Sequence, residues 1–164
     1  MPIRAAPLLL LVGIVAVNRP PPALTSPMEL AAWSKCNPDK IGDYLGQRVA
    51  YPEFPIKQDT WLPADIIMRR KWGDCKGRAV VARDALLACD YRTARIATIT
   101  TGVPGTIGYQ RHAIVLFTDP KTGRRGYIDA EYVRRYEPTT PWAEVVANEP
   151  RWQPKGWRLE PQGE

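Results

Sequence analysis

The stretch WGDCKGRAVVARDALLACDY, residues 72–91, is the most informative part of this chain for both fold and chemistry. Cys75 follows Gly73 and Asp74 and directly precedes a run that is typical of a helix. The first turn of a helix has unpaired backbone N–H groups and the positive end of the helix dipole. Both favour a thiolate over a thiol, so this position lowers the pKa of a cysteine. The stretch therefore predicts a reactive cysteine at the start of a helix.

The helix is predicted over residues 75–89 from the spacing of its small and apolar residues. Positions that recur at alternating steps of four and three share one helix face, and here they are Cys75, Ala79, Ala82, Leu86 and Cys89. We expect Lys76, Arg78 and Arg83 to point mostly away from this face. A buried structural cysteine is the competing interpretation of Cys75, because unpaired cysteine is often buried.

The single histidine, His112, begins the run HAIVLF, which is typical of a central strand covered on both faces. The following DPKTGR contains proline and glycine and predicts a hairpin turn, so that RGYIDA returns antiparallel. Counted back from a turn near Pro120 and Lys121, Asp129 lies roughly opposite His112, within about two residues. An aspartate there can hold an imidazole in one tautomer. Cys75, His112 and Asp129 are therefore candidates for a catalytic triad.

Other assignments stay open for the histidine and the acid. A lone histidine at a strand end is often only a polar edge residue, and Asp129 by itself is typical of an ordinary strand end. The competing carboxylates are Asp74, Asp119 and Glu131. Asp119 lies in the turn, whereas Glu131 has the same facing as Asp129 one pleat further on and is the reserve candidate.

The motifs GDCKGRA, HAIV and YIDAEY, in this order, resemble the bacterial transglutaminase-like superfamily of papain-type cysteine enzymes. The preceding WLPADIIMRRKWGDC is also similar to that family, and the resemblance covers roughly residues 60–135. It implies an α+β, papain-like or transglutaminase-like fold, in which a nucleophile helix packs on an antiparallel β-sheet. It also implies that Cys75 is the nucleophile, His112 the general base and Asp129 the orienting acid.

The resemblance further implies a thiol-dependent amide-bond hydrolase or transamidase, that is, a cysteine protease or acyltransferase with a thioester intermediate. The expected partner is a peptide or protein substrate, with cell-wall peptide among the options. Lys76 and Gly77 depart from the family, in which acidic residues often follow the cysteine, so the local substrate contacts differ. Two alternatives stay open: a catalytically inactive binding module on the same fold, and a murein endopeptidase of a related papain-like family.

An acyl-transfer reaction also needs hydrogen-bond donors for the oxyanion. The backbone N–H of Cys75 is one expected donor, because of its place at the helix start. The second donor should be an upstream side chain. Gln58, Trp61 and Trp72 are the candidates, and the sequence does not choose among them.

The N-terminal segment predicts export. Arg4 precedes the apolar run LLLLVGIVAV, which is shorter than the roughly 20 residues of a membrane-spanning helix and is followed by a proline-rich stretch. We expect residues 1–23 to be a signal peptide or N-terminal anchor, and residues 24–164 to be one transglutaminase-like domain with its core at 60–136. The expected location is periplasmic or extracellular, with an uncleaved membrane anchor as the alternative.

An oxidising compartment bears on the other two cysteines. Cys36 and Cys89 can form a disulfide there. Burial of Cys89 as an apolar side chain is the other interpretation, and the sequence leaves both open.

The chain is basic, with a formal net charge of +6. Its basic residues are spread along the chain and are not interleaved with aromatic residues, so we expect no nucleic-acid partner. They are expected on solvated faces that attract an acidic partner, such as an anionic envelope polymer. One histidine and three scattered cysteines offer no convincing metal set, so neither a metal nor another cofactor is expected.

Local patterns predict the remaining elements. Helices are expected at residues 27–36, 63–71 and 141–148, a strand at 92–100, and loop-like or extended chain at 49–57. Residues 101–111 are expected to be a glycine-rich loop that leads into His112. Three tryptophans near the C-terminus, at 142, 152 and 157, are expected to pack on the body or to line a substrate groove.

Overall fold

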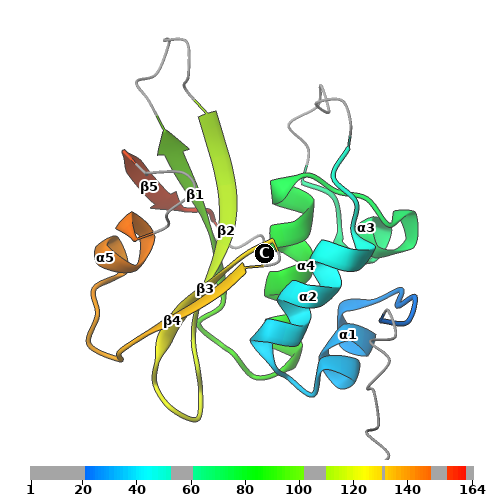
Figure 1. The fold of residues 1–164 in the computed structure, drawn as a ribbon, viewed down its shortest axis with the longest axis horizontal. Coiled ribbons are helices and arrows are strands. Elements are labelled where there is room, and N and C mark those ends of the chain that lie inside the picture. The colour runs from blue at the N-terminus through cyan, green and yellow to red at the C-terminus, as the bar shows by residue number, and fades with distance from the viewer. Residues whose placement is uncertain (1–20, 53–60, 102–109, 131, 149–154, 162–164) are drawn as a thin grey trace, which may run out of the picture.

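The computed structural model describes residues 21–52, 61–101, 110–130, 132–148 and 155–161. Within them the chain is α+β, with a five-stranded antiparallel sheet and helices on both of its sides (Figure 1). The helices are α1 (Pro27–Ser34), α2 (Pro38–Arg48), α3 (Ala64–Arg70), α4 (Cys75–Ala88) and α5 (Trp142–Ala147). The strands are β1 (Arg95–Thr101), β2 (Gln110–Thr118), β3 (Arg125–Asp129), β4 (Tyr132–Tyr136) and β5 (Gly156–Leu159). The sheet order is β4-β3-β2-β1-β5, and the α+β class is confirmed.

The sheet separates two hydrophobic cores, because alternate residues of a strand point to opposite faces. On one face Ile96, Val115 and Ile128 pack with side chains of α1 to α4. On the other face Ile114 and Tyr127 pack with α5. Figure 1 shows the sheet between α5 on one side and the other four helices on the other. The predicted packing of the cysteine helix on an antiparallel sheet is confirmed, since α4 contacts β1, β2 and β3.

The hairpin predicted from DPKTGR is present. Strands β2 and β3 are antiparallel neighbours, with Val115 opposite Ile128. Asp119 is a turn residue, as expected, and its carboxylate accepts two backbone N–H groups of the turn. Asp129 is the last residue of β3. The hairpin therefore brings Asp129 near the start of β2, where His112 lies.

The helices expected at 27–36, 63–71 and 141–148 are α1, α3 and α5, and the strand expected at 92–100 is β1. The glycine-rich loop was expected to extend to residue 111, which is wrong at its end. Gln110 and Arg111 belong to β2, because they pair with Thr101 and Thr100 of β1. Residues 102–109, the rest of that loop, lie outside the described residues.

Helix α2 was not expected from the sequence. Its first turn is stabilised by Asn37, whose side chain accepts the N–H of Asp39, and by Pro38 at the first helical position. The helix buries Ile41 and Leu45 in the core that it shares with α4. Its C-terminal end leads directly into residues 49–51, which contact the start of α4 as described below.

A disulfide joins Cys36, after α1, to Cys89, after α4. Of the two interpretations that the sequence left open, pairing is the one that the structure has. The bridge links residues 53 apart in sequence, and closing a loop of that length stabilises a folded chain by about 4 kcal/mol. Cys75 is the free cysteine.

Two tryptophans of the C-terminal region can be placed. Trp142 packs against the core on the α5 side, and the Arg125 guanidinium lies 5.1 Å from its ring centroid. Trp157 lies on β5 and is 36% exposed. Trp152 lies outside the described residues.

Among the described residues, no helix has the length and apolar character needed to cross a bilayer. Most of the expected signal peptide or anchor, residues 1–20 of 1–23, lies outside them.

Candidate active site

Cys75 is the first residue of α4, as the sequence predicts. Asp74 caps the helix, and its carboxylate accepts the N–H of Gly77 at 3.0 Å. Of the competing carboxylates, Asp74 therefore serves as a helix cap. The half-buried Cys75 side chain lies at the end of the helix where backbone N–H groups and the helix dipole favour a negative charge.

Two glycines of the GDCKG motif let α3 lie close against the start of α4. A Cβ atom at Gly73 would lie 3.0 Å from Ile67 of α3, and a Cβ atom at Gly77 would also lie 3.0 Å from Ile67. Both distances are shorter than an ordinary carbon–carbon contact. The motif thus combines a cap, a cysteine and two close-approach glycines within five residues of one another, which fixes where the helix begins.

His112 and Asp129 form a buried pair. The Nε2 atom of His112 lies 2.6 Å from Oδ1 of Asp129, and their side chains are 7% and 1% exposed. An acceptor on Nε2 leaves Nδ1 as the ring nitrogen that can face another group. The register expected from the sequence thus brings the histidine and the carboxylate together.

The thiol of Cys75 completes this contact series. The His112 side chain and the backbone of Ala113 lie close enough to the cysteine sulfur for their hydrogen-bonding groups to lower the pKa of the thiol. This approach is possible because the described ladder between β2 and β3 ends at Val115 and Ile128. Past that point, His112 and Ala113 of β2 lie beside Cys75 at the N-terminal end of α4. Cys75, His112 and Asp129, predicted separately from the sequence, therefore lie in one continuous contact.

The pKa of Cys75 is lower than that of an ordinary cysteine, and the pKa of His112 is higher than that of an ordinary histidine. Burial raises the pKa of the Cys75 thiol, but hydrogen bonds from His112, Ala113 and Tyr51 and the histidine charge outweigh burial, so the pKa is lowered. Burial lowers the pKa of His112, but hydrogen bonds to Asp129 and Cys75 and their charges raise it to about 9. A lowered cysteine pKa and a raised histidine pKa favour a thiolate–imidazolium pair at neutral pH.

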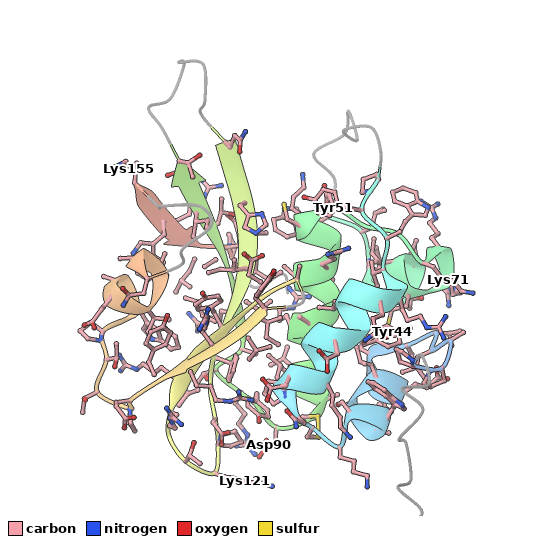
Figure 2. The ribbon with its side chains drawn as sticks, in the orientation of Figure 1. Tyr44, Tyr51, Lys71, Asp90, Lys121 and Lys155 are labelled. Atoms are coloured by element: carbon pink, nitrogen blue, oxygen red, sulfur yellow. A yellow bond between two sulfur atoms is a disulfide. The ribbon has the colours of Figure 1, made fainter. Side chains whose placement is uncertain are left out.

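Tyr51 is a neighbour of Cys75 that the sequence did not indicate. Its hydroxyl oxygen accepts the backbone N–H of Cys75 at 3.1 Å, and its O–H donates to the cysteine sulfur. Figure 2 shows Tyr51 at the N-terminal end of α4, at the opposite end of the molecule from Asp90 and Lys121. No local pattern identifies this residue, because it is 24 positions before the cysteine.

Arg78 was expected to point away from the buried helix face, and this expectation is wrong. Arg78 is only 8% exposed, and it donates from Nη2 to the carbonyl oxygen of Val49 at 2.5 Å. Its guanidinium carbon lies 5.3 Å from the ring centroid of Tyr51. The charged group is buried because it has a backbone acceptor and an aromatic face to contact.

Of the three side chains expected as the second oxyanion donor, the structure describes two, Trp61 and Trp72. Gln58 lies outside the described residues. Trp61 borders a cavity of about 910 Å³ that lies between α3, α4 and β1, and the Trp72 ring lies 5.7 Å from the Arg70 guanidinium. The side chain that contacts the Cys75 N–H is Tyr51. Glu131, the reserve acid, also lies outside the described residues.

We expect Cys75 to react with iodoacetamide at pH 6 far faster than an ordinary cysteine. Only the thiolate reacts, and a thiol with a pKa of 9.0 is about one part in a thousand ionised at pH 6. A lowered pKa keeps the thiolate populated as the pH falls, so the alkylation rate declines only below that pKa. The measurement is the rate against pH by mass spectrometry, with the urea-unfolded chain as the control; equal rates at pH 6 would contradict the lowered pKa.

Within the part of the chain that the structure describes, no three His, Cys, Asp or Glu side chains gather in the way that metal ligands do. No protein-family model matches the chain, and no curated protein matches its sequence. What Cys75, His112 and Asp129 can do together is therefore inferred from their own chemistry.

Proposed function

We propose that this chain is a thiol-dependent amide-bond hydrolase or transamidase of the transglutaminase-like type, on a papain-like fold. The observation that supports the proposal most is the contact series Cys75–His112–Asp129 at the start of α4. A buried structural cysteine has no need of an imidazole and a buried carboxylate aligned behind it. A cysteine nucleophile needs both, because the imidazole must accept and return a proton and the carboxylate must orient the imidazole.

The proposed reaction begins with attack by the Cys75 thiolate on the carbonyl carbon of an amide. A C–S bond forms, and the carbonyl π-electron pair moves to oxygen. When the tetrahedral intermediate collapses, the C–N bond breaks and the leaving amine takes the proton of the His112 imidazolium, which leaves a thioester on Cys75. Neutral His112 then accepts a proton from water or from an acceptor amine as that nucleophile attacks the thioester. When this second intermediate collapses, the C–S bond breaks and its electron pair returns to sulfur, which restores the Cys75 thiolate beside protonated His112. Water gives hydrolysis and an amine gives transamidation.

The substrate that fits this proposal is a peptide or protein amide, with cell-wall peptide as one option. The cavity of about 910 Å³ beside α4 has a size typical of small-molecule and side-chain binding sites. Its lining includes Val80 of the cysteine helix and Ile96 of β1, together with Arg83 and the carboxylates Asp84 and Glu160. Cys75, His112 and Asp129 are not among the residues that line it, so this cavity does not define which substrate reaches the nucleophile.

The proposed location is the periplasm or the extracellular space. The disulfide between Cys36 and Cys89 supports it, because disulfides persist in oxidising compartments and are rare in the reducing cytosol. The apolar N-terminal run after Arg4 supports the same location.

Trapping of the acyl-enzyme tests the proposal. The chain is mixed with p-nitrophenyl acetate, quenched in acid within seconds, digested and mapped by mass spectrometry. We expect one acetyl group on Cys75. In samples quenched later, hydrolysis should remove this acetyl group, and an added amine should take it up if transamidation operates. Acetylation spread over surface lysines, with none on Cys75, would contradict the proposal and favour a binding module. A peptide library drawn from murein stems then separates a murein endopeptidase from the other enzymes.

A further inference from the structure

The hydroxyl group of Tyr51 lies where the charge of an acyl-transfer intermediate develops. It touches two atoms of the nucleophile: it accepts the backbone N–H of Cys75 at 3.1 Å and donates to the cysteine sulfur. In a thioester-forming reaction the carbonyl oxygen of the substrate must lie beside both the attacking sulfur and the N–H of the nucleophile. The Tyr51 hydroxyl is therefore adjacent to the position of that oxygen.

Two backbone hydrogen bonds fix the residue before Tyr51. The N–H of Ala50 donates to the carbonyl of Lys71 at 2.9 Å, and the N–H of Gly73 donates to the carbonyl of Ala50 at 3.0 Å. These bonds form a parallel bridge between Ala50 and Trp72, just before the cysteine helix. The segment before Tyr51 is thus attached to the same stretch of chain that positions Cys75.

The ring of Tyr51 is held by Arg78. The guanidinium stacks on the ring at 5.3 Å and is itself anchored on the Val49 carbonyl. Arg78 lies on α4, one turn after Cys75, so the ring and the nucleophile are positioned by the same helix. Tyr51 remains 53% exposed, and a substrate can therefore approach its hydroxyl from solvent.

The Tyr51 hydroxyl keeps its proton across the useful pH range. Burial, the negative charge of Cys75 and the hydrogen bond to the cysteine raise the pKa of Tyr51 to about 12. A neutral phenol donates one hydrogen bond and can rotate its O–H from one acceptor to another. It is therefore equipped to donate first to a thiolate and then to an oxyanion.

We propose that Tyr51 is a catalytic residue whose hydroxyl, with the backbone N–H of Cys75, forms the pair of donors that stabilises the oxyanion. The inference rests on the proposed thiol-dependent function. In the free protein the O–H donates to the thiolate. As the C–S bond forms, the negative charge passes from sulfur to the carbonyl oxygen. The Tyr51 hydroxyl shifts away from the Cys75 N–H, which then donates to that oxygen, and the Tyr51 O–H turns from sulfur to the same oxygen. No proton leaves Tyr51, and its hydrogen bond to the oxyanion is stronger than its earlier bond to sulfur, because sulfur is the weaker acceptor.

The test compares two reactions of the same thiolate in wild type and in Tyr51→Phe. p-Nitrophenyl acetate acylates the cysteine through an oxyanion, whereas iodoacetamide alkylates it by displacement at a saturated carbon, with no oxyanion. The ratio of the two rate constants at one pH removes any change in the amount of thiolate. We expect this ratio to fall by about 10²–10³-fold in Tyr51→Phe, which is the usual effect of removing one oxyanion donor.

Tyr44→Phe is the matched control. The Tyr44 hydroxyl also accepts one backbone N–H and donates to one backbone carbonyl, both of Leu24, and Tyr44 lies in α2, away from Tyr51 (Figure 2). Its ratio should equal that of wild type. The exposed position of Tyr51 makes phenylalanine compatible with folding, and the alkylation rate itself reports an intact site.

The outcomes separate the two proposals. If wild type acylates Cys75 and Tyr51→Phe keeps the wild-type ratio, Tyr51 is not an oxyanion donor and the enzyme proposal stands. A lower alkylation rate at pH 6 with an unchanged ratio would mean that Tyr51 only stabilises the thiolate, which also overturns the inference. If wild type acylates no faster than Cys75→Ala, the proposed function fails, and the role of Tyr51 fails with it.

Discussion

Replacement of Cys75 by alanine is expected to reduce turnover of amide and ester substrates to the uncatalysed background. In a triad enzyme, loss of the nucleophile lowers kcat by on the order of 10⁶-fold, because the remaining groups have no atom with which to form the covalent intermediate. The measurement is steady-state release of p-nitrophenolate or p-nitroaniline from a panel of esters and anilides, read against buffer alone.

The fold should survive this substitution. The capping carboxylate of α4 belongs to Asp74, and the close approach of α3 depends on Gly73 and Gly77, so neither feature needs the cysteine side chain. Cys75 is also outside the disulfide. Circular dichroism and the melting temperature of Cys75→Ala should match those of wild type within a few degrees.

Cys75→Ser is the sharper variant, because it changes one atom. A serine hydroxyl keeps the size and hydrogen-bonding capacity of the thiol, but it does not ionise beside His112 as a thiol does. We expect activity close to that of Cys75→Ala. Equal product release in wild type and in both variants would mean that turnover does not depend on the thiol, and the binding module would then be the better description.

The parts of the site that the sequence predicts are those set by local patterns. The position of Cys75 at the start of a helix is predicted by Gly73 and Asp74 before it and by the small residues that follow it on one helix face. The facing of His112 and Asp129 follows from a strand, a turn of recognisable composition and a returning strand, because a hairpin fixes register within a residue or two. Both relations involve elements that are adjacent in the chain.

The parts that the sequence does not predict depend on contacts between distant segments. Tyr51 reaches Cys75 only because α2 ends at Arg48 and Ala50 bridges Trp72, and neither contact has a local signature. Arg78 is buried because a carbonyl 29 residues earlier and the Tyr51 ring accept its guanidinium. A helix-face count on α4 cannot include partners that another part of the chain supplies.

Weak or short elements were missed for a different reason. Strand β4 reads YVRRY, and strand β5 has only four residues, GWRL. Both lie at an edge of the sheet, where few residues are buried and the apolar alternation that identifies a strand is weak. Helix α2 carries two glycines, which reduce helix propensity, although its Asn-Pro-Asp start is a usable signal.

Asp129→Asn is expected to lower turnover by about 10–150-fold while keeping the geometry. The substitution preserves the shape of a side chain that is 1% exposed and removes its charge. A hydrogen bond to a charged group contributes about 1.5–3 kcal/mol, and losing that amount of transition-state stabilisation lowers the rate by about 10–150-fold. Serine triads lose about 10⁴-fold on the same change. The loss should be smaller here, because the thiolate also stabilises the His112 imidazolium.

The pH profile gives this prediction a direction as well as a size. His112 must be protonated to donate to the leaving amine, so wild-type activity should fall as the pH rises through the histidine pKa of about 9. Without the Asp129 charge and hydrogen bond, the histidine pKa drops toward its ordinary value of 6.5. The descending limb of kcat/KM should therefore move to lower pH in Asp129→Asn, and activity should be best retained on the acid side.

Substitutions of two other carboxylates, Asp119 and Glu131, serve as controls for the assignment of Asp129 as the orienting acid. Asp119→Asn changes a turn carboxylate of the same hairpin that accepts backbone N–H groups, and it should leave both the rate and the pH limb unchanged. Glu131→Gln should also have little effect, because Asp129 already occupies Nε2 of His112. A crippling effect of Glu131→Gln together with a harmless Asp129→Asn would transfer the orienting role to Glu131. The thiol mechanism would survive that result, because the descending limb would still report the protonation of His112.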